Sequence, residues 1–317
     1  MNKILVTGCV GFIGFHLTKY LLEKNYNVVG IDNINNYYSI KIKKNRKKEL
    51  NKYKNFNFQK IDISNFNLLQ KLFVKNKFKM VFNLAAQAGV SYSVKNPEKY
   101  FNTNIKGFFN ICKLSKDYSI SKVIYASSSS VYGDNKNLPV KEIYNVNPLN
   151  YYAISKVNNE VTAKFFSEVS NIKFIGLRFF SVYGPFGRPD MLIYKMINAY
   201  NKKKIFYLNN FGNHSRDFTY IDDVVQIIFK LSKLNLKNKS EIFNICNSKK
   251  IKLSVLIDFF KKKKILPKII KRKFQFGDIK HAYGDNKKLR KIVKLSKYTK
   301  FEEGLDKTFK WYFKNNL

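Results

Sequence analysis

The sequence contains no long hydrophobic run and no export signal. No stretch of its 317 residues approaches the roughly 18 consecutive apolar residues that a membrane span requires. The first residues, MNKILVTG, lead from a short apolar run directly into a glycine turn, without the longer apolar region and cleavage site of a secretory signal. We therefore expect a soluble, cytoplasmic protein that does not insert into a membrane.

Potential metal ligands are few and scattered. The three cysteines are widely spaced and form no CxxC pair, so they indicate neither a disulfide framework nor a zinc site: Cys9, Cys112 and Cys246. The three histidines are equally isolated: His16, His214 and His281. The sequence thus predicts no metal site and a reducing compartment.

Arginine is scarce, because 6 of the 60 basic residues are arginine and 54 are lysine. The formal net charge of +39 would attract polyanions such as nucleic acid. The lysines gather at 41–48, 260–273 and 286–297, without periodic aromatic residues that could stack on bases. We interpret these clusters as solvated surface and expect no specific nucleic-acid partner. A non-catalytic polyanion-binding protein is the alternative that this charge leaves open.

The chain does contain a glycine-rich turn between an apolar strand and a helix. The strand candidate KILVTG leads into GCVGFIG (8–14), and the next apolar run ends in Asp32. Gly8 and Gly11 would let the backbone approach a pyrophosphate, and Gly14 would let the helix pack tightly on the strand. An acidic residue at the end of the strand that follows such a turn binds the hydroxyls of the adenosine ribose. Because a carboxylate would repel a 2′-phosphate, Asp32 favours NAD over NADP.

Further strand candidates alternate with helical stretches through the first half: 56–64, 79–86, 121–130 and 172–180. This alternation predicts an α/β fold with a Rossmann-type, doubly wound parallel sheet. After residue 180 the alternation loosens into amphipathic helices, which we expect to form a substrate lid: 193–204, 222–233 and 253–264.

The expected organisation is therefore an NAD-binding Rossmann domain and a smaller C-terminal α/β domain. The first would span 1–180, with a strand returning near 242–247. The second, mainly 181–317, would bind the substrate.

The segment NYYAISKVNNE (150–160) carries two adjacent tyrosines and one lysine. On a helix Tyr152 and Lys156 would lie side by side, while Tyr151 points elsewhere. A phenol with a pKa of about 10 is a poor base at neutral pH, but a neighbouring ammonium favours the phenolate. We predict that Tyr152 is a catalytic base and that Tyr151 is structural or lines the pocket.

Four patterns together resemble the extended short-chain dehydrogenase/reductase family of NAD-dependent epimerases and dehydratases. They are TGCVGFIG at the start, NLAA at 83–86, the serine run before VYG, and YxxxK at 152–156. The resemblance covers nearly the whole chain. It implies that Tyr152 is the acid/base, that Lys156 contacts the nicotinamide ribose, and that Ser128 is the catalytic serine. It also implies an NAD site that includes Gly8, Gly11, Phe12, Ile13, Gly14, Asp32, Asn33, Asp62, Ile63, Leu84, Ala85, Ala86 and Asn104.

The serine run bears on the reaction. In this family the 4,6-dehydratases carry Asp-Glu immediately before VYG, and UDP-glucuronate decarboxylases usually carry Glu at the second position. Here these positions are Ser129 and Ser130. Without an additional acid or base, the simplest chemistry is oxidation followed by reduction at one carbon, which is epimerisation.

Longer segments resemble the UDP-glucuronate 4-epimerases of the family: NLAAQAGVSYSVKNP (83–97), LRFFSVYGPFGRPDM (177–191), RDFTYIDDVV (216–225) and IDNINNYYSIKIK (31–43). The resemblance implies that Ser128, Ser129, Ser181 and Arg188 contact the sugar, with Ser181 and Arg188 at its carboxylate. A guanidinium takes a carboxylate as a bidentate pair. Arg216 would contact the UDP phosphates.

Two positions depart from the pattern of that subgroup. Ser91 stands where its GVRYS segment carries arginine, so one positive charge is missing, and Phe186 replaces a common tryptophan. The expected reaction is NAD-dependent conversion of UDP-glucuronate to UDP-galacturonate for surface polysaccharide. A UDP-glucose/UDP-galactose 4-epimerase, or another nucleotide-sugar epimerase or dehydratase, is the alternative.

Two predicted helices, around 100–117 and 151–168, carry apolar residues on more than one face. Members of the family often pair these helices in a dimeric four-helix bundle. The resemblance therefore implies a homodimer.

Overall fold

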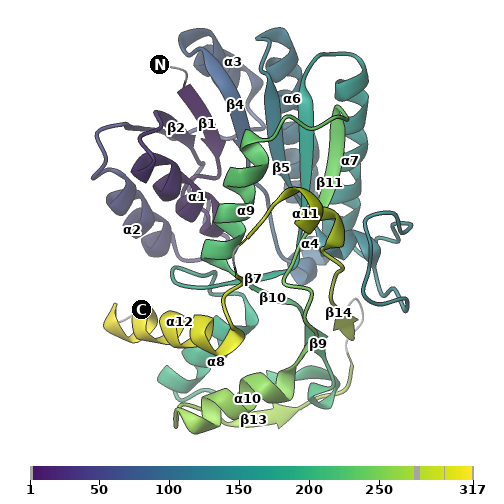
Figure 1. Ribbon diagram of the computed structural model, residues 1–317. Coiled ribbons are helices and arrows are strands. Elements are labelled where there is room, and N and C mark those ends of the chain that lie inside the picture. The colour runs from purple at the N-terminus through teal and green to yellow at the C-terminus, as the bar shows by residue number, and fades with distance from the viewer. Residues whose placement is uncertain (1–2, 275–278, 296, 316–317) are drawn as a thin grey trace.

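A seven-stranded parallel sheet forms the centre of the computed structural model, which describes residues 3–274, 279–295 and 297–315 (Figure 1). Its strands lie in the order β11-β6-β5-β4-β1-β2-β3. Their bounds are β1 Lys3–Thr7, β2 Val28–Ile31, β3 Phe56–Gln59, β4 Phe78–Asn83, β5 Lys122–Ser128, β6 Lys173–Phe179 and β11 Ser240–Ile245. The sheet confirms the predicted doubly wound α/β fold, and β11 joins it from beyond residue 180 by pairing in parallel with β6.

Helices cover both faces of this sheet. On one face α1 (Phe12–Glu23) packs against α2 (Ile40–Leu50) and α9 (Ile221–Lys233). On the other face α6 (Gly107–Asp117) packs between α3 (Phe66–Lys75) and α7 (Tyr151–Glu168). Each face buries its own apolar cluster, because strands buried on both faces carry apolar side chains in both directions.

Helix α9 corrects one expectation. Its segment was expected in the substrate lid, but it packs on α1 against the main sheet (Figure 1). Asp222 and Asp223 in its first turn, and Lys230 and Lys233 in its last, suit the helix dipole. Its apolar stripe supplies Val224, Ile228 and Leu231 to the core, along with neighbouring residues.

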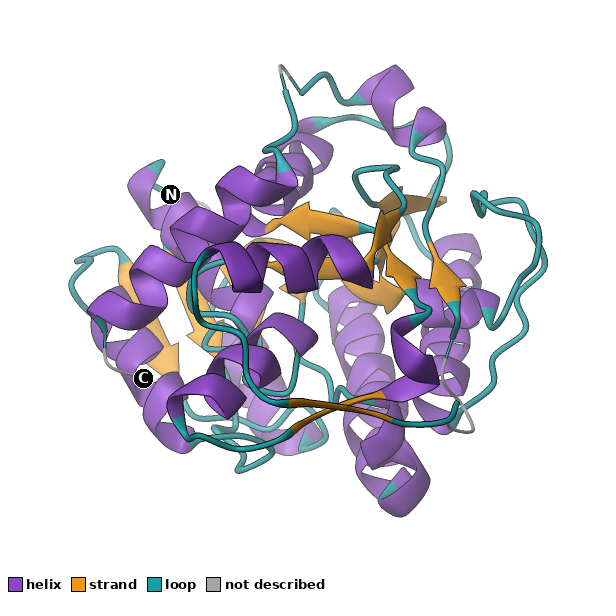
Figure 2. Ribbon diagram, turned by 90° about the horizontal axis from the view of Figure 1, so that it is seen from below, coloured by secondary structure: helices purple, strands orange, loops and turns teal. Residues whose placement is uncertain are grey.

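The remaining elements form a smaller lobe below the carboxyl ends of the strands. Seen from below, its short strands and helices lie across the end of the main sheet (Figure 2). Its helices are α8 Leu192–Asn201, α10 Leu253–Lys262 and α12 Phe301–Lys314. Its strands pair as β7 (Ser181–Tyr183) with β10 (Phe218–Tyr220), as β8 (Phe206–Leu208) with β13 (Ile269–Lys271), and as β12 (Ile251–Lys252) and β14 (His281–Ala282) on either side of β9 (Ser215–Arg216).

Six short elements make up the rest of the described helices. They are α4 Val90–Lys95, α5 Pro97–Tyr100, the π-helix η1 Phe101–Lys106, the 3₁₀ turns η2 Ser129–Tyr132 and η3 Asn209–Gly212, and α11 Lys287–Ile292. Helices α5, η1 and α6 follow one another without a break, which makes one long rod beside α7. Among the described residues, no helix is both long and apolar enough to cross a membrane.

The lysine cluster at 41–48 is not entirely solvated surface, contrary to the expectation. Lys43 and Arg46 face inward from α2 and are buried. Lys43 Nζ donates to the side-chain oxygen of Asn35 at 2.7 Å. Two cations of this cluster are therefore buried.

Candidate active site

A cavity of about 1140 Å³ opens at the carboxyl ends of the sheet strands, between the sheet and the smaller lobe. The strand order reverses between β1 and β4, which is where open α/β sheets bind ligands. Residues from both lobes line the cavity, so it can hold a dinucleotide and a second molecule together.

The glycine turn after β1 forms one end of this cavity. Gly8 has a φ of +67°, and a Cβ there would lie 2.7 Å from the backbone nitrogen of Ala85. A Cβ on Gly14 would lie 2.0 Å from the carbonyl oxygen of Gly8. No side chain caps the start of α1 at Gly11, so its first amides are available to an anion. The turn thus fits a dinucleotide pyrophosphate.

Two acidic residues stand beside this turn, at the ends of β2 and β3. Asp32 is buried and accepts a hydrogen bond from the amide of Ile34 at 2.7 Å. Burial raises the pKa of Asp32, and the nearby ammonium of Lys43 opposes this effect. Asn33 donates to Asp62 at 2.7 Å, which joins the two strand ends into one wall. This wall fits the adenosine part of NAD.

Tyr152 and Lys156 lie one turn apart on α7, as their spacing predicts. The side chain of Asn150 caps this helix by accepting from the amide of Ala153 at 3.0 Å. Lys156 Nζ lies 5.9 Å from the centre of the Tyr152 ring and donates to the carbonyl oxygen of Ala126 at 2.8 Å. The ammonium is therefore held between the tyrosine and β5.

Burial shifts the pKa values of this pair in opposite directions. It lowers the pKa of Lys156 to about 7, and the charge of Glu160 opposes that change. It raises the pKa of Tyr152, against the effects of a hydrogen bond with Ser128 and of the charge on Arg188. Both shifts disfavour the charged forms, which are the Tyr152 phenolate and the Lys156 ammonium. These forms therefore require neighbouring charges that stabilise them.

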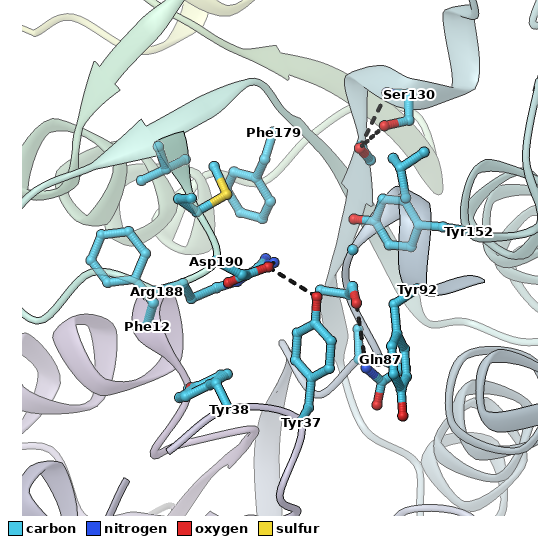
Figure 3. Close-up of a pocket in the computed structure, with 18 of the residues that line it drawn as sticks. Phe12, Tyr37, Tyr38, Gln87, Tyr92, Ser130, Tyr152, Phe179, Arg188 and Asp190 are labelled. Carbon is cyan, nitrogen blue, oxygen red and sulfur yellow. Dashed lines mark hydrogen bonds and ion pairs between the residues drawn. The ribbon is translucent and has the colours of Figure 1, made fainter. Parts of the chain in front are cut away.

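The serine run sits where β5 ends. Ser128 Oγ donates to Ser130 Oγ at 3.0 Å and accepts from the amide of Ser130 at 3.1 Å. Ser127 points away from Tyr152, because its hydroxyl donates to Glu160 at 2.6 Å. Ser128 therefore presents its hydroxyl to Tyr152, and Ser130 lies on the same side of the cavity as the tyrosine (Figure 3).

A cluster of polar residues faces Tyr152 from the other side of the cavity (Figure 3). Arg188 pairs with Asp190 through Nε at 3.0 Å and Nη2 at 2.5 Å. Tyr37, from the segment after β2, donates to the same carboxylate at 2.9 Å. Burial raises the pKa of the Asp190 carboxyl group, but the charge and hydrogen bonds of Arg188, together with the hydrogen bond from Tyr37, lower it below its ordinary value. Asp190 thus connects the two lobes across the cavity.

The loop that carries Arg188 is anchored to the glycine turn by Arg46. Arg46 Nη1 donates to the carbonyl oxygen of Val10 at 2.8 Å, and Nη2 donates to that of Phe186 at 2.5 Å. His16 hydrogen-bonds the carbonyl oxygen of Pro185 at 2.9 Å, and burial lowers its pKa to about 3. Phe186, at a φ of +54°, packs between Phe15 and Trp311.

The structure brings nearly all of the predicted site residues together. The cavity is lined by Gly8, Gly11, Phe12, Ile13, Gly14, Asp32, Asn33, Asp62, Ile63, Leu84, Ala85, Ala86, Ser128, Ser129, Tyr152, Lys156, Ser181, Arg188 and Arg216. Asn104 does not line it. Its side chain instead bonds both backbone groups of Gln87, at 2.8 and 3.0 Å, from behind. Tyr151 lines a separate shallow depression beside Phe101.

Sequence reasoning missed other residues of the cavity wall. Tyr37, Asp190, Lys43 and Gln87 all line it. Tyr37 and Asp190 lie within segments that were matched to the family, but nothing in those segments indicated that they meet.

Within 3–274, 279–295 and 297–315, no group of three His, Cys, Asp or Glu side chains is placed to hold a metal ion.

Comparison with known proteins identifies the family. The sequence model of the NAD dependent epimerase/dehydratase family matches residues 4–246. An uncharacterized protein of Methanocaldococcus jannaschii is 42% identical, with 99% of this chain and 97% of that protein covered. A UDP-glucuronate 4-epimerase of Thermodesulfobacterium geofontis is 35% identical, with 99% and 97% covered.

A solved structure shows the same fold. The crystal structure of a UDP-glucuronic acid 4-epimerase from Bacillus cereus, in complex with UDP-glucuronic acid and NAD, has a TM-score of 0.92 and 29% identity. The similarity covers 99% of both chains. With its glycine turn, its Tyr152–Lys156 pair and these relatives, the chain belongs to the NAD-dependent epimerase/dehydratase family.

Proposed function

We propose that this protein is an NAD-dependent UDP-glucuronate 4-epimerase, an isomerase that interconverts UDP-glucuronate and UDP-galacturonate. The observation that carries the proposal is the meeting of three features in one cavity. Tyr152 and Lys156 lie beside the serine run, the dinucleotide turn lies at one end, and Arg188 faces the tyrosine. Relatives of the same length include UDP-glucuronate 4-epimerases.

The residues of the first half would hold NAD, with Gly8, Gly11 and Gly14 at the pyrophosphate and Asp32 at the adenosine ribose. Lys156 would contact the nicotinamide ribose. Bound NAD would supply the acceptor for a hydride from C4 of the sugar and return the hydride to the opposite face.

The chain itself would move the proton and hold the sugar. In this mechanism the Tyr152 phenolate takes the proton of the 4-hydroxyl as the carbonyl forms, and gives it back after the sugar ring has turned. Ser128 hydrogen-bonds the same oxygen, and the Lys156 ammonium stabilises the phenolate. Arg216 and residues of the smaller lobe would retain the diphosphate while the ring turns.

A 4-keto uronate is a β-keto acid and readily loses carbon dioxide, so the carboxylate must be held where this cleavage is unfavourable. Ser181 and Arg188 are proposed for that task. Asp190 already occupies the Nε and Nη2 edge of Arg188. The sugar carboxylate would therefore use the remaining Nη1 edge, or share the guanidinium with Asp190.

One observation favours a neutral sugar as the second candidate. Arg188 is neutralised by Asp190, and Ser91 adds no charge at the cavity rim where the subgroup has arginine. Both features weaken the preference for a carboxylate. The alternative function is 4-epimerisation of UDP-glucose and UDP-galactose.

The decisive experiment incubates the purified protein with UDP-glucuronate and UDP-glucose separately and resolves the products by NMR. We expect UDP-galacturonate from the first, little turnover of the second, and a loss of at least about 100-fold in Tyr152→Phe. Arg188→Ala should lower turnover of UDP-glucuronate and release a UDP-pentose. Turnover of UDP-glucose alone would establish the alternative, and full activity of Tyr152→Phe would refute the mechanism.

We further propose that residues 1–180, with β11, bind NAD, and that residues 181–317 mainly bind the UDP-sugar.

We also propose a homodimer through α6 and α7. In support, this helix pair and the adjoining η1 expose large apolar side chains: Phe101, Phe109, Ile154, Val161 and Phe165. Phe165→Glu should release monomers in sedimentation analysis, whereas Phe313→Glu, at an exposed position on α12, should not. The three buried free cysteines fit a reducing cytoplasm, where the product would supply polysaccharide synthesis.

A further inference from the structure

A buried ion pair lies behind Lys156, and the proposed mechanism does not use it. Glu160 follows Lys156 by one turn of α7, and Arg178 reaches it from β6. Arg178 Nε lies 2.8 Å from Glu160 Oε1, and Nη2 lies 2.7 Å from Oε2. The two side chains are only 4% and 7% exposed.

The pair contacts both elements that carry the catalytic groups. Glu160 accepts the hydroxyl of Ser127 at 2.6 Å, next to Ser128 on β5. The Arg178 guanidinium lies 4.6 Å from the ring of Tyr132, which ends the serine turn. Glu160 therefore has a fixed place between α7 and the end of β5, one helical turn after Lys156.

Lys156 needs such a charge, because burial alone disfavours an ammonium. Burial lowers the pKa of Lys156 to about 7, and Glu160 is the group that opposes this shift. Arg178 stays charged, since Glu160 raises its pKa against the effect of burial. Other titratable groups act on the ion pair and on Tyr152. Tyr125 on β5 interacts with Glu160 and Arg178, Tyr132 in η2 interacts with Arg178 and with Glu142 before α7, and Arg188 and Asp190 act on Tyr152 from across the cavity.

We propose that Glu160, held in place by Arg178, is a positioning residue that keeps the Lys156 side chain charged beside Tyr152. The inference rests on the proposed function, in which Lys156 acts on Tyr152. A neutral amine would not stabilise the phenolate, so Glu160 promotes proton transfer without touching substrate or cofactor.

The test compares Glu160→Gln with Glu160→Asp in the NAD-loaded enzyme. Glutamine keeps the shape and an acceptor for Ser127, but it removes the charge. We expect kcat to fall about 10- to 100-fold while KM changes less than about 2-fold. The acid limb of the pH profile of kcat should move to lower pH by about one unit, because the doubly protonated Tyr–Lys pair then loses its first proton more easily. Aspartate retains the charge and should restore most of kcat.

Because Glu160→Gln leaves Arg178 buried without a counter-charge, a double variant separates folding from catalysis. Glu160→Met/Arg178→Met replaces both charges with apolar side chains of similar length. A folded double variant with the same loss of kcat and the same acid shift supports the proposal. A folded double variant with the wild-type kcat and pH profile overturns it.

A direct measurement needs no turnover. Lysine labelled with ¹³C at Cε reports the ionisation of Lys156 by NMR, with Lys156→Arg to assign the signal. In Glu160→Gln the midpoint of the Lys156 titration should move to lower pH by about one unit or more. An unchanged titration overturns the inference. Wild-type protein that converts no UDP-sugar would refute the proposed function instead, and the NMR titration would still decide the role of Glu160.

Discussion

Removing Arg178 should destabilise the protein far more than removing an exposed lysine from an ion pair of similar length. Arg178→Met leaves Glu160 buried and without its counter-charge, and breaking a buried pair in this way costs about 3–5 kcal/mol of unfolding free energy. The matched control is Lys113→Met. Lys113 lies 2.8 Å from Asp117, but these side chains are 45% and 38% exposed, so the loss should stay below about 1 kcal/mol.

Equilibrium urea unfolding of the NAD-free protein measures both changes. Glu160→Met/Arg178→Met should be only about 1–2 kcal/mol less stable than the wild type, because neither charge of the ion pair is left buried without the other, although Ser127 loses its hydrogen-bond partner. Equal costs for Arg178→Met and Lys113→Met would refute the reasoning.

Three further predictions test the cofactor turn, the polar cluster and the buried histidine. Gly14→Ala places a Cβ 2.0 Å from the carbonyl oxygen of Gly8, so NAD affinity should fall at least about 100-fold in a fluorescence titration; unchanged affinity would contradict the assignment of the turn. Tyr37→Phe removes the hydrogen bond to Asp190 and should raise KM for UDP-glucuronate about 10-fold, while an equal rise for UDP-glucose would contradict a role at the carboxylate. The pKa of His16 is about 3 in the fold against an ordinary 6.5, so wild-type stability should fall as the pH drops from about 6.5 toward 3, by up to about 4 kcal/mol from this group. His16→Gln should lack this part of the slope in urea unfolding, and an identical slope would contradict it.

The parts of the site that could be predicted from sequence are those fixed by local geometry. The glycine turn follows a strand directly, and the close approach of Gly14 to the carbonyl oxygen of Gly8 is set within a few residues. Tyr152 and Lys156 share a helix face because four residues make about one turn. The serine run ends a strand, and strands of a parallel sheet end at the same edge. Short-range rules therefore sufficed to bring these residues to one cavity.

The other contacts depend on residues far apart in the chain, and sequence spacing carries no information about them. Tyr37 and Asp190 are 153 residues apart, yet they share a hydrogen bond across the cavity. Asn104 was expected at the cofactor, but it lies in the π-helix η1, whose wider turn changes the direction of its side chains relative to an α-helix. It therefore holds Gln87 from behind instead of lining the cavity.

Three of the six arginines make contacts that lysine could not make. Arg46 spans acceptors in two lobes with its two terminal nitrogens, and Arg178 and Arg188 each grip a carboxylate with Nε and Nη2. A lysine ammonium is a single point and cannot make these paired, planar contacts. In a chain that otherwise uses lysine for its positive charge, these arginines stand where the geometry requires a guanidinium. Lysine at position 46 would keep the charge but would lose its contact either with the glycine turn or with the loop that carries Arg188. The two halves of the cavity would then no longer be fixed relative to one another.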